Sequence, residues 1–169
     1  GYSPSSAGSV SQTACAAGTY QPNTGQTSCT DADAGYYVSI TGSPSQTACA
    51  AGTYQPSMGQ SSCLDASVGY YVPTTAATSQ TACAAGTYQP NTGQTSCTDA
   101  DAGNYVSMTG SPSQTACAAG TYQPSMGQSS CLDASAGYYV PTTAATSQTL
   151  CATGTYQPST GQSSCTDAS

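Results

Sequence analysis

Ten cysteines are the residues of this chain whose type and spacing could support chemistry. Short gaps, such as that from Cys15 to Cys29, alternate with longer ones, such as that from Cys29 to Cys49. Paired cysteines in a chain with few large apolar residues indicate disulfides and an oxidising compartment. The alternative is a metal thiolate site, but zinc sites use Cys-x-x-Cys pairs or histidine partners, and this chain has neither. The predicted disulfide residues are Cys15, Cys29, Cys49, Cys63, Cys83, Cys97, Cys117, Cys131, Cys151 and Cys165.

The remaining polar side chains offer little for catalysis. Histidine, lysine, arginine and glutamate are absent, so no base is available to activate a serine or threonine hydroxyl. We therefore predict no enzymatic activity and no cofactor. The net charge of −7 comes from aspartate alone, and without cations the chain is not expected to bind nucleic acid. No apolar run reaches the length of a bilayer span, so no membrane insertion is expected.

Two Asp-Ala-Asp segments have the oxygen-rich spacing of calcium sites: Asp31 with Asp33, and Asp99 with Asp101. Calcium sites usually recruit further carboxylates, which the neighbouring sequence does not provide. We favour solvated turns capped by aspartate and keep weak calcium binding as the alternative.

Clusters of threonine indicate covalent O-glycans. The segment "VPTTAATSQT" occurs at residues 72–81 and again at 140–149, and it resembles segments that carry O-linked sugars. No Asn-x-Ser/Thr sequon is present, so N-glycans are not expected. The predicted O-glycosylation sites are Thr74, Thr75, Thr78, Thr142, Thr143 and Thr146, with bare loops as the alternative.

The cysteines belong to an internal repeat whose period equals the sequence separation between Cys15 and Cys49. Two repeat flavours alternate, since "CTDADAGYYVSITGSPSQTAC" from Cys29 returns as "CTDADAGNYVSMTGSPSQTAC" from Cys97. Each repeat divides into two halves of equal length that share Ala-Gly and Tyr positions and carry one cysteine each. We predict that the chain is a segment of a longer array. Its five repeats are expected at 1–34, 35–68, 69–102, 103–136 and 137–169.

The halves resemble the ephrin-receptor-like cysteine-rich repeat, a relative of the tumour necrosis factor receptor cysteine-rich modules. That family's half-unit reads approximately Cys-Thr-Pro-Cys-Pro-Ala-Gly-Tyr-Tyr, followed by a Ser/Gly-rich turn and another cysteine. Here "CTDADAGYY" from Cys29 keeps the first cysteine and "QTACAAGTY" from Gln46 keeps the second. The replaced positions hold Ala32, Ala66, Ala100 and Ala134, and Gln46, Gln80, Gln114 and Gln148. The resemblance covers essentially the whole chain and implies the pairs Cys15–Cys29, Cys49–Cys63, Cys83–Cys97, Cys117–Cys131 and Cys151–Cys165.

The segment between Cys49 and Cys63 favours the same local pairing. A Thr-Tyr-Gln strand leads into Pro-Ser-Met-Gly, which has the residues of a turn, and Gln60–Ser62 is expected to return as a strand. A disulfide across the base of this hairpin needs little distortion. The alternative pairing joins cysteines across the longer gaps, such as Cys29 with Cys49, and leaves Cys15 and Cys165 over. It stays open only if these two cysteines bond to neighbouring chains.

The other half-repeat predicts a second hairpin, with Tyr71 and Val72 as its leading strand and a turn around Pro73. The predicted fold is therefore a small disulfide-rich all-β protein, a linear array of stapled β-hairpin repeats that forms an elongated rod. Tyrosines are expected to stack between the modules; the alternative is an exposed aromatic ladder that binds sugars.

Near-identical repeats are typical of a structural protein, because identical modules make identical longitudinal contacts. We predict a repeat segment of an extracellular filament, stalk or surface appendage, whose partners are copies of itself end to end. The alternative is a ligand-binding or adhesive receptor ectodomain, although repeats this uniform offer no privileged site. The expected location is extracellular or at the cell surface.

Overall fold

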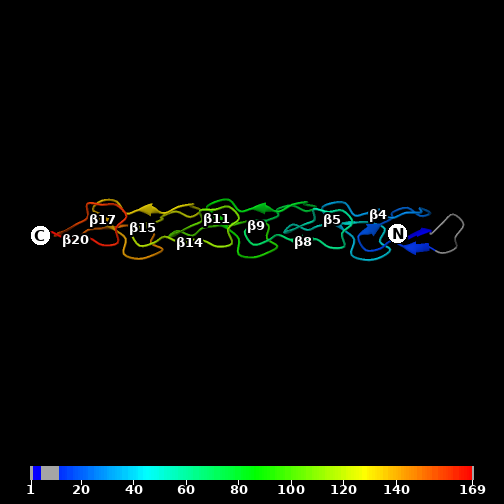
Figure 1. The fold of residues 1–169 in the computed structure, drawn as a ribbon, viewed down its shortest axis with the longest axis horizontal. Helices are drawn as coiled ribbons and strands as arrows, with labels where there is room; N and C mark the ends of the chain where they lie inside the picture. Colours follow the sequence, from blue (N-terminus) through cyan, green and yellow to red (C-terminus); the bar gives the residue numbers. More distant parts are fainter. Residues whose placement is uncertain (1, 5–11, 169) are drawn as a thin grey trace. The chain divides into compact units, whose positions relative to one another are not determined.

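A computed structural model of the chain describes residues 2–4 and 12–168. Short strands alternate with longer connecting segments, and no helix occurs in these ranges (Figure 1). The strands are β1 (Tyr2–Pro4), β2 (Gln12–Ala14), β3 (Thr19–Tyr20), β4 (Thr30–Asp31), β5 (Tyr36–Tyr37), β6 (Thr47–Ala48), β7 (Thr53–Tyr54), β8 (Leu64–Asp65), β9 (Tyr70–Tyr71), β10 (Thr81–Ala82), β11 (Thr87–Tyr88), β12 (Thr98–Asp99), β13 (Asn104–Tyr105), β14 (Thr115–Ala116), β15 (Thr121–Tyr122), β16 (Leu132–Asp133), β17 (Tyr138–Tyr139), β18 (Thr149–Leu150), β19 (Thr155–Tyr156) and β20 (Thr166–Asp167).

Each odd-numbered strand pairs with the next strand to form a two-stranded sheet. The sequence explains these lengths, because threonine and tyrosine favour the extended backbone, whereas the proline that follows Tyr-Gln has no N–H to continue the ladder. In the β7–β8 hairpin, Thr53 lies opposite Asp65 and Tyr54 opposite Leu64. The β15–β16 hairpin, two repeats further along the chain, has the same antiparallel register.

The prediction of a return strand at Gln60–Ser62 is wrong. The chain there forms bends, and the return strand is β8, directly after Cys63. The physical reason is that this segment bonds to a different hairpin: the Gln60 carbonyl accepts the Val38 N–H at 3.0 Å. The loop between β7 and β8 is consequently longer than a tight turn.

The predicted Tyr71–Val72 strand is likewise shifted by one residue, to Tyr70–Tyr71. Val72 leaves the ladder because its N–H donates to the Gln94 carbonyl at 2.9 Å, and its side chain is only 1% exposed. Val72 is therefore a core residue that anchors one hairpin to another.

The chain divides into two compact units. Unit 1 comprises Gly1–Ser67, Tyr71–Thr81 and Thr92–Ser96, and unit 2 comprises Val68–Tyr70, Ala82–Asn91 and Cys97–Ser169. Unit 1 contains the hairpins formed by β1 to β8, and unit 2 contains those formed by β11 to β20.

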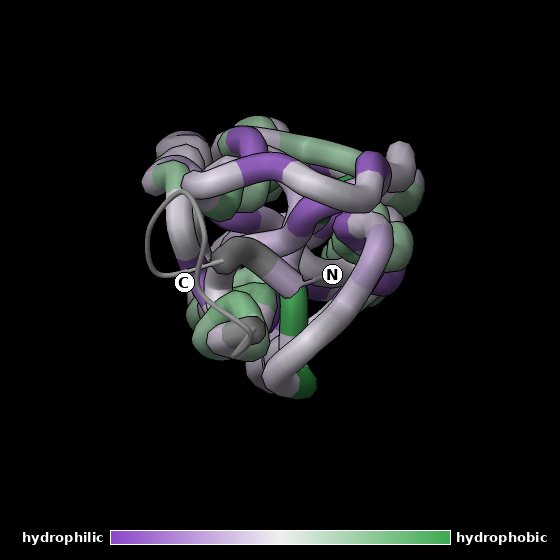
Figure 2. The backbone as a smooth tube through the Cα atoms, turned by 90° about the vertical axis from the view of Figure 1, so that its right-hand side faces the viewer, coloured by the Kyte–Doolittle hydropathy of each residue, from purple (hydrophilic) through white to green (hydrophobic). Residues whose placement is uncertain are grey.

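Small residues form the core of both units. Figure 2 shows that strongly hydrophobic stretches of the backbone are short and are separated by pale or hydrophilic ones. Larger apolar side chains, such as Ile40 at 67% and Met108 at 70%, are exposed. The buried positions are held by Cys15, Cys49, Cys83 and Cys117, by Ala32, Ala66, Ala100 and Ala134, by Val38, Val72, Val106 and Val140, and by Gln21, Gln55, Gln89, Gln123 and Ser43.

The prediction of a small, disulfide-rich all-β array of hairpin repeats is confirmed. Hairpins recur at the half-repeat period, as the evenly spaced starts of β3, β5, β7 and β9 show. The elongated rod shape and the five repeat boundaries stay predictions. Within the described ranges, no helix is long and apolar enough to span a bilayer.

Candidate functional site

Five disulfides are the most regular feature of the structure, and all ten cysteines take part in them. The Cα atoms of each pair lie 5.7 to 5.8 Å apart, within the usual range for a disulfide. The first cysteine of the pair Cys49–Cys63 is fully buried and the second is half-buried. The pairs are those that the family resemblance implies: Cys15–Cys29, Cys49–Cys63, Cys83–Cys97, Cys117–Cys131 and Cys151–Cys165.

The position of each disulfide differs from the expected one. Cys49 directly follows β6, and Cys63 directly precedes β8. The disulfide therefore joins the β5–β6 hairpin to the β7–β8 hairpin, whereas a bridge across the base of one hairpin was expected. The difference follows from the shifted return strand, which begins after the second cysteine.

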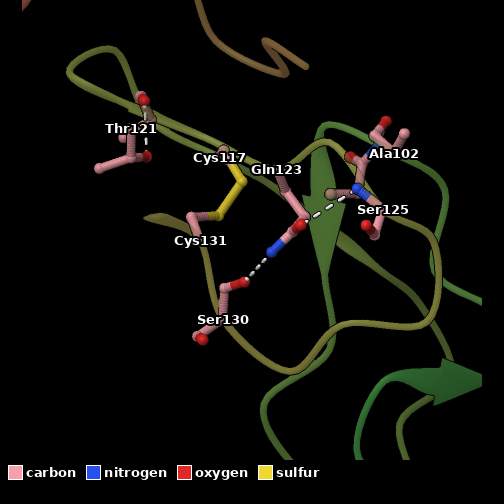
Figure 3. Close-up of a disulfide and its surroundings, with 9 residues drawn as sticks. Ala102, Cys117, Thr121, Gln123, Ser125, Ser130 and Cys131 are labelled. Carbon is pink, nitrogen blue, oxygen red and sulfur yellow. Dashed lines mark hydrogen bonds between the residues drawn. A yellow bond between two sulfur atoms is a disulfide. The ribbon is translucent and has the colours of Figure 1, made fainter. Parts of the chain in front are cut away.

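In four of the five disulfide-containing halves, a buried glutamine holds the long loop. In Figure 3, the Gln123 side chain lies between Ser125 and Ser130, beside the Cys117–Cys131 disulfide. Its Nε2 donates to the Ser130 carbonyl at 2.8 Å, and its Oε1 accepts the Ser125 N–H at 3.1 Å. Because the amide is buried and both its nitrogen and its oxygen have a hydrogen-bond partner, it fixes the loop without the cost of an unpaired polar atom.

The same arrangement occurs in other repeats. Gln55 donates to the Ser62 carbonyl at 2.8 Å and accepts the Ser57 N–H at 3.1 Å. Gln21 is equivalent, and its side chain donates to the Ser28 carbonyl at 2.7 Å. The loop conformation is therefore set by one side chain and not by a tight turn.

A second glutamine replaces the disulfide in the alternate halves. Ala32 follows β4 and Gln46 precedes β6, so these two residues lie where Cys49 and Cys63 lie one half-repeat later. The Asp33 N–H donates to Gln46 Oε1 at 2.7 Å, and Gln46 Nε2 donates to an Asp33 carboxylate oxygen at 2.7 Å. We call this pair of bonds the glutamine clip; it joins the β3–β4 hairpin to the β5–β6 hairpin.

The glutamine clip recurs with a different partner side chain in alternate repeats. Gln114 bonds to Asp101 in the same two ways as Gln46 bonds to Asp33. Gln148 accepts the Ser135 N–H at 2.6 Å, and its amide lies 3.4 Å from the Ser135 hydroxyl oxygen. The backbone bond is thus shared by both repeat flavours, and the side-chain bond is strongest where aspartate is present.

The aspartates proposed for calcium are used in part by this clip. The carboxylates of Asp33 and Asp101 accept hydrogen bonds from the clip glutamines, while Asp31 and Asp99 lie in exposed strands. In the described part of the chain, no three His, Cys, Asp or Glu side chains come together as metal ligands.

The six threonines predicted to carry glycans are all exposed. Thr74, Thr75 and Thr78 lie on a loop of unit 1 in which Ala76 has a positive φ of 56°. The equivalent loop of unit 2 places Ala144 in the same conformation, with a φ of 55°. These hydroxyls are accessible to modification; whether they carry sugars stays a prediction.

The sequence patterns did not predict that glutamine side chains hold the long loops and replace the disulfide in the alternate halves. A signal was available, because glutamine stands at every position where the family pattern loses its first cysteine, and Tyr-Gln-Pro recurs in every disulfide-containing half. The loop glutamine Gln123 is 4% exposed, whereas the clip residue Gln114 is half-buried.

Comparison with known proteins supports the resemblance. No curated protein matches the chain. The model of the family described as tyrosine-protein kinase ephrin type A/B receptor-like matches residues 35–83 and 103–151, more than half of the chain. This family is a receptor-like cysteine-rich module and not an enzyme family, and together with the disulfides it points to an extracellular location. The chain belongs to the ephrin type A/B receptor-like family.

Proposed function

We propose that this chain is a structural repeat segment of an extracellular filament, stalk or surface appendage, in which copies of the repeat follow one another end to end. The observation that supports this role is the backbone hydrogen-bond register between hairpins. In unit 1, the Gly35 N–H donates to the Gln55 carbonyl at 2.8 Å, and the Gly59 N–H donates to the Ala32 carbonyl at 2.7 Å. The Gly35 bond joins successive hairpins through their main chains, and the Gly59 bond joins the β7–β8 hairpin to the end of the β3–β4 hairpin.

The same register recurs in unit 2. The Gly103 N–H donates to the Gln123 carbonyl at 2.8 Å, and the Gly127 N–H donates to the Ala100 carbonyl at 2.8 Å. The other repeat flavour makes the same two bonds: the Gly69 N–H donates to the Gln89 carbonyl at 2.8 Å, and the Gly93 N–H donates to the Ala66 carbonyl at 2.8 Å. A module whose contacts repeat in this way can be extended by adding copies, which is the design that a filament requires.

Electron microscopy of native material tests this function. Long fibres of uniform width are expected if the repeats are structural. Small-angle scattering of recombinant chains with five and with ten repeats provides a second test, and the maximum dimension should roughly double. A round particle, or a dimension that stays nearly constant, contradicts the proposal.

O-glycans on the exposed threonines are part of this proposal. The chain has no basic residues and few charged ones, so sugars would keep an exposed array soluble. Intact-mass measurement of native material tests for the O-glycans, because the polypeptide alone has a mass of 16.6 kDa. Replacement of Thr74, Thr75 and Thr78 by alanine should remove a defined share of any additional mass, whereas a native mass equal to that of the polypeptide excludes glycans.

A ligand-binding or adhesive receptor ectodomain is the second candidate, and family membership favours it. Microscopy separates the two functions, since isolated ectodomains at a cell surface would replace the fibres. The extracellular location is common to both candidates.

A further inference from the structure

Two open grooves occupy equivalent positions, one in each compact unit. The groove of unit 1 has a volume of about 510 Å³ and is lined by residues that include Tyr37, Thr47, Thr53, Ser62 and Cys63. The groove of unit 2 has a volume of about 530 Å³, and its lining residues are the equivalents two repeats later, from Tyr105 to Cys131. Both volumes are in the range of ligand sites in proteins.

Two hairpins and a disulfide build the unit 1 groove. Tyr37 and Thr47 are cross-strand partners in the β5–β6 hairpin, and Thr53 begins β7. Ser62 and Cys63 come from the loop that the Cys49–Cys63 disulfide fastens to the end of β6. The walls therefore come from two hairpins that a covalent bond holds together.

Hydrogen bonds hold the groove in place before any ligand binds. The Thr53 hydroxyl donates to the Ala50 carbonyl at 2.8 Å, which leaves its oxygen able to accept. The Ser62 backbone is held by Gln55. Figure 3 shows the equivalent wall of the unit 2 groove, where Thr121 and Ser130 lie near the Cys117–Cys131 disulfide. A site fixed in this way loses little conformational entropy on binding.

The lining residues determine the class of ligand. A tyrosine ring, alanine methyl groups and threonine methyl groups give the groove apolar surface, while threonine, serine and tyrosine hydroxyls supply hydrogen-bond donors and acceptors. Among the described residues, no charged side chain lines either groove. An ionic ligand would find no counter-charge, and a wholly apolar ligand would form no hydrogen bonds with the lining hydroxyls.

We propose that these two grooves bind an uncharged saccharide, with one face of a pyranose ring on Tyr37 or Tyr105 and the sugar hydroxyls bonded to the lining threonines and serine. This inference goes beyond the structural role, since a filament needs no such site. The saccharide can come from an external polysaccharide or from a glycan on another copy of the chain.

Titration of chain produced without glycans tests the site. The probes are neutral hexasaccharides of glucose, mannose and N-acetylglucosamine at millimolar concentration, followed by amide chemical shifts. At least one probe should shift the amides of Thr47 and Thr53 and their unit 2 equivalents. If none of the three does so, a glycosylated preparation of the chain is the second probe; binding to it identifies a glycan of another copy as the source. The proposal is overturned if neither kind of probe shifts these amides.

Matched variants separate binding from folding. Thr47→Val with Thr115→Val keeps the side-chain shape but removes one hydroxyl from each groove, and it should weaken binding about threefold to tenfold. Tyr37→Ala with Tyr105→Ala should weaken it about tenfold. Tyr156→Ala, an exposed tyrosine outside both grooves, should leave binding unchanged. Unchanged affinity in the valine double variant, with its disulfides intact, contradicts the assignment.

Discussion

The close approach of two glycines within unit 1 gives the sharpest test of the packing. Gly52 has a φ of +88°, and a Cβ built on it would overlap the backbone oxygen of Gly93, which is also in unit 1. Gly154 occupies the same repeat position with a φ of +87°, but a Cβ there would meet none of the described residues within 4 Å. The two glycines therefore share their backbone conformation and differ in steric contact.

We expect Gly154→Ala to destabilise its hairpin by about 1 kcal/mol, because left-handed backbone costs alanine about 1–2 kcal/mol and the less flexible unfolded chain returns part of that. Gly52→Ala carries the same cost and adds about 1–3 kcal/mol of overpacking, since the clash is with main chain and no side chain can move aside. The expected total for Gly52→Ala is about 2–4 kcal/mol.

Hydrogen exchange with mass spectrometry is the assay, because a repeat array can open locally and need not unfold in two states. The β7–β8 peptide of Gly52→Ala should exchange much faster than that of the parent chain. The β19–β20 peptide of Gly154→Ala should change far less. Equal effects of the two substitutions would refute the reasoning, because they would show that Gly52 and Gly93 do not approach as described.

Three further predictions concern the joints and loops. Ala32→Cys with Gln46→Cys places two cysteines at the disulfide positions of an alternate half, so non-reducing peptide mapping should find a sixth disulfide; free thiols there would contradict the equivalence of the halves. Gln123→Ala removes two hydrogen bonds, one to the Ser130 carbonyl and one from the Ser125 N–H, and should cost about 1–3 kcal/mol in chemical denaturation, whereas Gln157→Ala, at a half-buried position, should cost less. Ala76 has a positive φ of 56°, so Ala76→Gly should raise the free energy of unfolding by up to about 1 kcal/mol in thermal denaturation. A lower free energy of unfolding would contradict the claim that the backbone is strained at this residue.

Two kinds of joint alternate along the chain. A disulfide that closes a loop of about 15 residues stabilises the fold by about 3 kcal/mol, whereas a hydrogen bond contributes about 1 kcal/mol, and somewhat more when one partner is charged. The clip between Gln46 and Asp33 is therefore the weaker joint. Local opening should begin in the halves that lack a disulfide, and reduction should remove the difference between the two kinds.

Much of the local architecture could be predicted from the sequence. Alternating cysteine gaps indicated disulfides, and the half-repeat pattern indicated hairpins and the family. These features are local, since turn residues and β-branched or aromatic residues act over a few positions. The leading strands were consequently predicted to within one residue, as Tyr70–Tyr71 shows.

Contacts between hairpins were decided only by the tertiary structure. The return strand lies at Leu64–Asp65 because Gln60 bonds to Val38 in the preceding hairpin, and no local pattern encodes that choice. For the same reason, the disulfide joins two hairpins, and Gln46 takes the place of a cysteine. Local sequence patterns specify which residues bend, extend and crosslink. The tertiary structure decided which neighbour each one meets, because backbone groups freed from a short ladder must find partners elsewhere in the fold.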